Sequence, residues 1–93
     1  MKDAIFVALV GDIIGEDLAR EIVAEPIRNE KTGMVETRYA VAYARILAMA
    51  DASLEASDQE TIRGNIDEGV RQFKDYFALI ECTKYMEMKF KLL

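Results

Sequence analysis

Two stripes of small residues at helical spacing constrain the fold of this chain more than any other feature. The first recurs at every fourth position in the middle of the sequence and consists of Ala40, Ala44, Ala48, Ala52 and Ala56. The second runs near the N-terminus in steps of three and four and consists of Ala4, Ala8, Gly11, Gly15 and Ala19. Residues three and four apart share a helix face, where small side chains allow two backbones to approach closely. The stripes predict closely packed helices, and they indicate no chemistry.

Length and composition predict one domain that is completed by further copies of the chain. The 93 residues are 52% apolar, and a globule of this size buries only part of its surface. We therefore expect residues 1–93 to form a single helical domain that assembles into a homo-oligomer, at least a dimer. The candidate oligomer interface comprises four alanines and three residues of the tail: Ala40, Ala44, Ala48, Ala52, Met86, Met88 and Phe90.

Charge and missing residue types exclude several classes of function. The net charge of −5 argues against DNA as a partner, because phosphate binding needs clustered Lys and Arg. The longest apolar run, residues 4–10, is too short to span a bilayer, so no membrane contact is expected. The single Cys82 forms no intrachain disulfide, which favours the cytoplasm. Histidine is absent, which excludes His-dependent catalysis and His-ligated metal within one chain, and no cofactor is expected.

Apolar residues at steps of four predict helix over about residues 3–27: Phe6, Val10, Ile14, Leu18 and Ile22. Gly11 and Gly15 predict a kink or a break, because each costs about 1 kcal/mol relative to Ala in a helix. Glu16 would then open a second piece, since acids are favourable at a helix N-terminus. The alternative is a buried strand over residues 5–10 before that helix. Such a turn would lack the third glycine and the Lys of phosphate-binding motifs.

A polar connection is predicted over residues 29–33. Pro26 ends or kinks the first segment, and Gly33 is placed for a positive φ. The residues from Val35 to Tyr43 alternate at period two, so a β-hairpin over residues 27–43 is the alternative. We favour a helix from about Glu36, because seven alanines lie between positions 40 and 56.

Ser57 and Glu60 form a capping-box pattern, which predicts that a helix starts here. The apolar residues behind it have the spacing of a core-facing seam: Ile62, Ile66, Val70, Phe73, Phe77 and Ile80. Residues 84–92 alternate like a strand, and their structure stays open. The predicted fold is all-α, a small bundle of three to four helices around a long antiparallel helical hairpin. The alternative is α+β, with short terminal strands or the hairpin over residues 27–43.

Two groups of polar residues are candidate sites. Five acids lie along one sector of the first segment: Asp12, Glu16, Asp17, Glu21 and Glu25. Glu21 and Glu25 have the spacing to hold Mg²⁺ or Mn²⁺. Arg20 and Arg28, however, lie three or four residues from acids of this sector and would pair with them, so we favour an ion-paired surface. The second group combines two aromatic and two guanidinium side chains: Arg38, Tyr39, Tyr43 and Arg45. Stacking and paired hydrogen-bond donors could bind an anionic nucleotide or peptide. The simpler interpretation is that the tyrosines lie at the edge of a core with their hydroxyls in water.

The sequence contains no recognisable set of catalytic residues, so binding is a more plausible role than catalysis. We expect a small cytoplasmic oligomer with a protein partner, acting as an adaptor, a chaperone-like protein or a regulatory factor of the kind that phages and mobile elements encode. The alternatives are a Mg²⁺- or Mn²⁺-dependent all-α nucleotide phosphohydrolase that uses the helical carboxylates, and a sensor or sponge for an anionic nucleotide.

Overall fold

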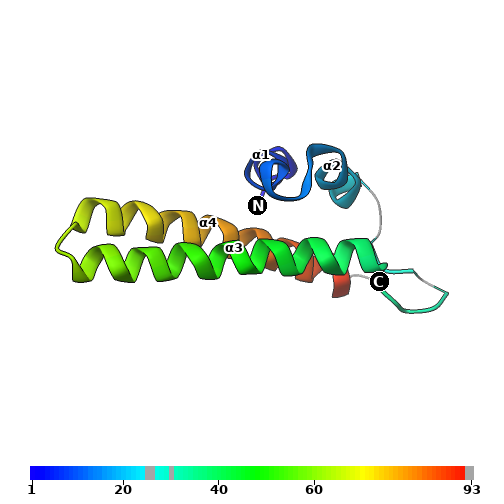
Figure 1. Ribbon diagram of the computed structural model, residues 1–93. Coiled ribbons are helices and arrows are strands. Elements are labelled where there is room, and N and C mark those ends of the chain that lie inside the picture. Colours follow the sequence, from blue (N-terminus) through cyan, green and yellow to red (C-terminus); the bar gives the residue numbers. More distant parts are fainter. Residues whose placement is uncertain (25–26, 30, 92–93) are drawn as a thin grey trace.

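The chain folds into four helices, and the last two form a long antiparallel hairpin (Figure 1). The computed structural model describes residues 1–24, 27–29 and 31–91. The helices are α1 (Asp3–Ile14), α2 (Glu16–Ala24), α3 (Thr37–Ile62) and α4 (Ile66–Lys91). The molecule measures 52 × 22 × 19 Å, because α3 and α4 run side by side over their whole length. The all-α bundle around a helical hairpin is therefore confirmed.

The break in the first segment is also confirmed. Gly15 separates α1 from α2 and has φ 93°, a conformation that suits a residue without Cβ. The turn folds α2 back beside α1, and the two helices lie across one end of the hairpin (Figure 1). Residues 4–10 are helical, so the strand alternative is wrong here. Two expectations lie outside the described residues: the pairing of Glu25 with Glu21 around a metal ion, and the end or kink of the first segment at Pro26.

The connection to α3 contains the predicted turn and almost no β structure. The side chain of Asn29 accepts hydrogen bonds from the amides of Lys31 and Thr32, at 2.9 and 3.2 Å, and Gly33 has φ 68°. The alternative, a β-hairpin over residues 27–43, is wrong: among the described residues it corresponds only to one isolated antiparallel bridge between Arg28 and Val35. The helix that follows begins at Thr37, next to the expected start at Glu36.

The capping-box prediction at Ser57 is wrong, because α3 continues through it to Ile62. The turn lies at residues 63–65, where Gly64 has φ 84° and its amide donates to the carbonyl of Thr61. The amide and the side chain of Asn65 both donate to Glu60, which gives the helix end a Schellman-type pattern. Ser57 instead donates its Oγ hydrogen bond across the hairpin to the carbonyl of Gly69, at 2.7 Å.

The predicted core-facing seam of α4 is wrong by one residue. The face that packs against α3 is formed by buried or half-buried residues in a heptad spacing, here called the inner seam: Gly69, Gln72, Tyr76, Leu79, Thr83, Met86 and Phe90. The predicted positions lie about 100° further round the helix. We call five of them the outer seam: Ile66, Val70, Phe73, Phe77 and Ile80. Residues 84–91 are helical and belong to the same α4, so the strand reading of the tail is wrong.

The hydrophobic core lies where α1 and α2 cover the hairpin. Phe6 stacks on the ring of Tyr85 with centroids 4.6 Å apart, and both Phe6 and Met86 are fully buried. Tyr85 also donates a 2.6 Å hydrogen bond to Asp3, which joins the start of α1 to the end of α4. The predicted apolar face of the first segment is confirmed, since Phe6, Val10, Ile14 and Ile22 are buried.

Candidate interaction surfaces

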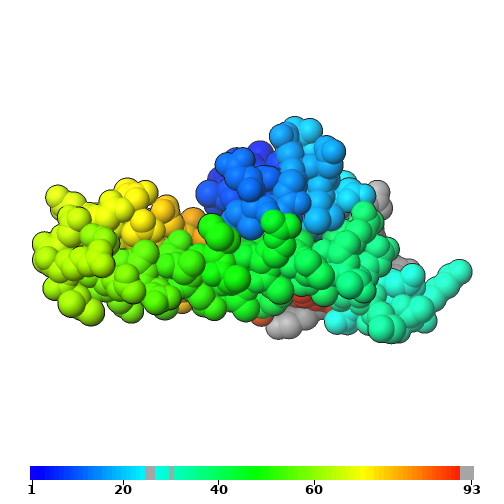
Figure 2. Space-filling view, in the orientation of Figure 1, coloured from blue at the N-terminus to red at the C-terminus, as the bar shows by residue number. Residues whose placement is uncertain are grey.

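The outer seam of α4 is a largely exposed apolar surface: four of its residues are exposed, and only Ile80, at its C-terminal end, is half-buried against the core. Ile66 is 55% exposed and Phe77 is 53% exposed, and α1 and α2 stop short of the end of the hairpin (Figure 2). Phe73 contacts Phe77 edge to face with centroids 5.0 Å apart, so the seam carries a small aromatic cluster. Monomeric proteins seldom expose a contiguous apolar surface of this kind unless it is used for binding.

Most of the net charge of the protein is concentrated at this end of the hairpin. The segment from residue 51 to residue 75, here called the tip, carries seven acidic and three basic side chains, against a net charge of −5 for the whole chain. Arg63 pairs with Glu60, and Arg71 pairs with Glu68 and approaches Asp75. The hydrogen bond from Arg71 lowers the pKa of Glu68 to about 2. Glu68 therefore stays charged at acidic pH below the ordinary pKa of a glutamate.

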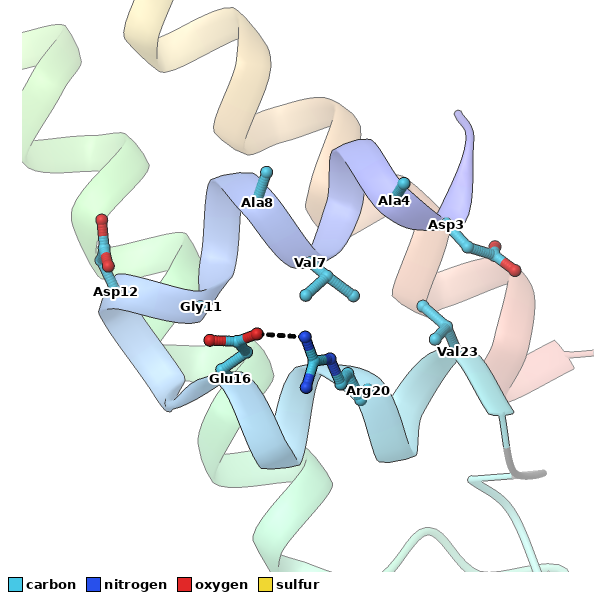
Figure 3. Close-up of a pocket in the computed structure, with 9 residues that line it drawn as sticks. All are labelled: Asp3, Ala4, Val7, Ala8, Gly11, Asp12, Glu16, Arg20 and Val23. Atoms are coloured by element: carbon cyan, nitrogen blue, oxygen red, sulfur yellow. Dashed lines mark ion pairs between the residues drawn. The ribbon is translucent and has the colours of Figure 1, made fainter.

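A groove of about 540 Å³ lies between α1 and α2, in the second stripe of small residues (Figure 3). Ala4, Ala8 and Gly11 line it together with Val7 and Val23, and the polar groups at its edges are Asp3, Asp12, Glu16 and Arg20. Glu16 and Arg20 form an ion pair across one helical turn. Asp3 accepts the hydrogen bond from Tyr85, so this groove offers no set of converging, unpaired polar groups.

The predicted ligand residues do not form one site. Arg38 donates to both carboxylate oxygens of Glu21 at 2.9 Å and to Glu36 at 2.9 Å, and these bonds raise the pKa of its guanidinium. Its remaining nitrogen donates to the hydroxyl of Tyr39. The guanidinium carbon of Arg38 also lies 4.6 Å from the centroid of the Tyr39 ring. Arg38 therefore fixes α2 to α3, and its donors are engaged within the chain.

Tyr43 and Arg45 lie apart from this pair. Tyr43 donates to Glu87 at 3.2 Å and packs on Phe90, and partial burial followed by the Glu87 charge raises its pKa. Arg45 is exposed beside Asp12 and Met49, in a shallow depression where α1 meets α3. The four residues are thus distributed over three environments.

Two of the four described acids of the sector form ion pairs, and Asp12 and Asp17 form none among the described residues. Glu16 binds Arg20 and Glu21 binds Arg38. No group of three or more Cys, Asp or Glu side chains able to hold a metal ion occurs in the part of the chain that the structure describes. The Glu21–Glu25 pair cannot be placed, because Glu25 lies outside that part.

The residues of the predicted oligomer interface divide between surface and core. Ala40, Ala44, Ala48 and Ala52 are all exposed on α3. A strict four-residue repeat advances about 40° beyond a full turn at each step, so the alanines wind around the helix rather than marking one face. Met88 is 62% exposed, whereas Phe90 is half-buried and Met86 is fully buried within the chain. Only some of these side chains are therefore accessible to a second copy.

The buried titratable groups stabilise the covered end of the molecule. Cys82 is fully buried, and burial raises the pKa of its thiol to about 11, so the thiol is neutral at pH 7. Burial, assisted by the bond to Asp3, raises the pKa of Tyr85. A neutral, inaccessible thiol is a poor nucleophile, so Cys82 has the properties of a packing residue.

Comparisons with known proteins add no relative. No family model, no curated protein and no solved structure matches the chain. Within the described residues, no helix combines the length and the apolar character needed to cross a membrane.

Sequence reasoning identified the residues of the outer seam but assigned them to the core. The spacing does not separate the two seams, because both registers repeat at heptad spacing one residue apart in the sequence. The outer register contains Ile66, Val70 and Phe73, while the inner one contains Gly69 and Gln72. Hydrophobicity alone therefore favoured the wrong register.

Proposed function

We propose that this protein acts by binding another polypeptide through the outer seam of α4, as an adaptor or regulatory factor. The observation that carries the proposal is the exposure of a heptad-spaced apolar row on a helix whose other heptad row already packs against α3. A helix with an exposed apolar row is stabilised when a second polypeptide covers that row, because apolar surface is removed from water. Self-association into at least a dimer is part of the proposal, with the exposed alanines of α3 as the second accessible surface.

The enzymatic and nucleotide-binding alternatives have less support. A phosphohydrolase would need carboxylates free to bind Mg²⁺, whereas Glu21 is engaged with Arg38. An anionic nucleotide would have to displace two carboxylates from the Arg38 guanidinium before binding to it. Both alternatives require existing ion pairs to break, and occupation of the outer seam requires none to break.

Site-specific photocrosslinking in the native host tests the proposal. A photoreactive phenylalanine analogue replaces Phe77 in the outer seam, and the same analogue replaces Met34, which is 68% exposed in the connection before α3. We expect covalent polypeptide adducts at position 77 and few at position 34. The mass of the adduct separates a second copy of the chain from a different protein. Equal, low yields at both positions would contradict the proposal.

A further inference from the structure

The outer seam has the geometry that accepts one further helix. Its residues follow one another in steps of four, three, four and three, the spacing at which two helices interlock their side chains. The inner seam has the same spacing, displaced by one residue, and it packs against α3 along the hairpin. Because Phe73 and Phe77 are both about half exposed, a partner helix would bury aromatic side chains of the kind that dominate binding energy.

The charges beside the seam define the chemistry of the partner. Of the three bases of the tip, Arg63 and Arg71 are already paired with its acids, whereas Lys74 lies beside the outer seam and forms no ion pair among the described residues. Asp51, Asp58 and Asp67 are exposed and form no ion pair among the described residues. A partner that carries Lys or Arg beside its apolar row would neutralise these carboxylates, and complementary charge increases both association rate and specificity.

A second copy of this chain is disfavoured at the same place. The tip has seven acids and three bases, so two tips packed together would bring two negative surfaces into contact. Within a Debye length of roughly 8 Å such charges repel, and the repulsion opposes association. An anionic membrane surface is disfavoured for the same reason.

We propose that the outer seam binds a basic amphipathic helix of a partner protein, with an apolar heptad row flanked by Lys or Arg. The inference rests on the proposed function, because it names the occupant of the same surface. The partner helix would lie along α4 about 100° round the helix from the side that packs against α3, with its basic flanks near the acids of the tip.

Designed peptides test this chemistry directly. The probe is a fluorescent peptide of about 21 residues, three heptads with Leu at the core positions and Lys at the flanking positions. The matched peptide differs only in having Glu at the flanking positions. Titration with the full chain, followed by fluorescence anisotropy, should show saturable binding of the Lys peptide and none of the Glu peptide. Binding of the Lys peptide should weaken as the salt concentration rises.

Variants of the chain separate seam binding from general attraction between charges. The double variant Val70→Ser with Phe77→Ser should reduce affinity for the Lys peptide by at least about tenfold, since it removes two central apolar contacts. The control Val41→Ser changes a valine that is 52% exposed on α3, far from the tip, and should leave affinity unchanged. The triple variant D51N, D58N and D67N should weaken binding and flatten its salt dependence.

The outcomes distinguish this inference from the proposed function. Equal affinity for the Lys and Glu peptides, or equal loss in the seam and control variants, would overturn the basic-helix assignment. If neither peptide binds while position 77 crosslinks to a second copy of the chain, the basic-helix assignment is wrong and the proposed function stands. If neither peptide binds and position 77 gives no adducts, both are wrong.

Discussion

The two ends of the hairpin are stabilised in different ways. Where α1 and α2 cover it, α3 and α4 bury Tyr39, Ile46 and Met86 together with Phe6 of α1. In the tip, none of residues 51–75 is a buried apolar side chain of the core, and the two helices meet through Ser57 and the small Gly69. The covered end thus has a conventional core, whereas the tip is a helix pair with an exposed apolar side. The difference places the buried core at one end of the molecule and the exposed apolar residues of the proposed binding surface toward the other.

The largest test of this comparison replaces one phenylalanine in the buried core and one in the outer seam. Phe6→Ala removes a fully buried ring that stacks on Tyr85, and we expect a loss of about 3–5 kcal/mol in the free energy of unfolding. Phe77→Ala removes a half-exposed ring from the outer seam and should cost about 1 kcal/mol or less. Urea unfolding monitored by circular dichroism measures both. Similar losses would mean that the two ends are equally important for folding.

The close approach of the helices in the tip is tested by Gly69→Ala. A Cβ at position 69 would lie 2.5 Å from Oγ1 of Thr61 and 3.3 Å from the carbonyl oxygen of Ser57. We expect the substitution to destabilise by about 1–3 kcal/mol, because helices forced apart here lose their packing. Thr61→Ala removes the nearest atom, so Gly69→Ala should cost less in that background, as measured by a double-mutant cycle. An unchanged cost would show that Thr61 is not the obstacle.

The acidic tip should also respond to low pH. The pKa of Glu68 is lowered from 4.5 to about 2 by its bond to Arg71, so the pair stabilises the folded state above the unfolded-state pKa. This contribution is lost as the pH falls from about 4.5 through about 2, where Glu68 becomes protonated in the folded state as well. The stability difference between wild type and Glu68→Gln should therefore decrease over that range in urea unfolding. Arg71→Gln should remove the same dependence, and a difference that is constant with pH would contradict the assignment.

The smallest expected effect is at the alanine surface of α3. Ala48 is exposed, so Ala48→Leu should change the stability of the isolated subunit by no more than about 0.5 kcal/mol. If copies of the chain associate through these alanines, the same substitution should change the assembly mass measured by light scattering, because leucine would separate the helices. A large loss of stability without a change in mass would show that Ala48 packs inside the subunit.

Local sequence patterns predicted the helices and some of their boundaries: the break at Gly15 and the start of α3 were predicted, and the turn between α3 and α4 was not. The four-residue spacing of Phe6, Val10 and Ile14 determines which face of α1 is buried, and Gly15 and Gly33 mark turns that need a positive φ. These features depend on neighbours within a few residues, so they can be inferred without knowledge of the fold. The all-α class and the long hairpin followed from the same patterns.

The candidate surface could not be predicted, because it depends on which of two apolar rows finds a partner. The sequence of α4 offers two heptad registers one residue apart, and the more apolar one, which includes Phe73 and Phe77, remained exposed. Tertiary packing selected the other register, in which the missing side chain of Gly69 lets Ser57 reach its carbonyl and Met86 is buried at the covered end. Ser57 was mistaken for a helix cap because the sequence does not show its true hydrogen-bond acceptor. That acceptor is the carbonyl of Gly69, twelve residues away on the opposite helix. The sequence by itself determined the helices and the residues of the apolar rows. Only the tertiary structure decided which row is core and which is surface, because burial is a property of the contacts between helices and not of any one helix.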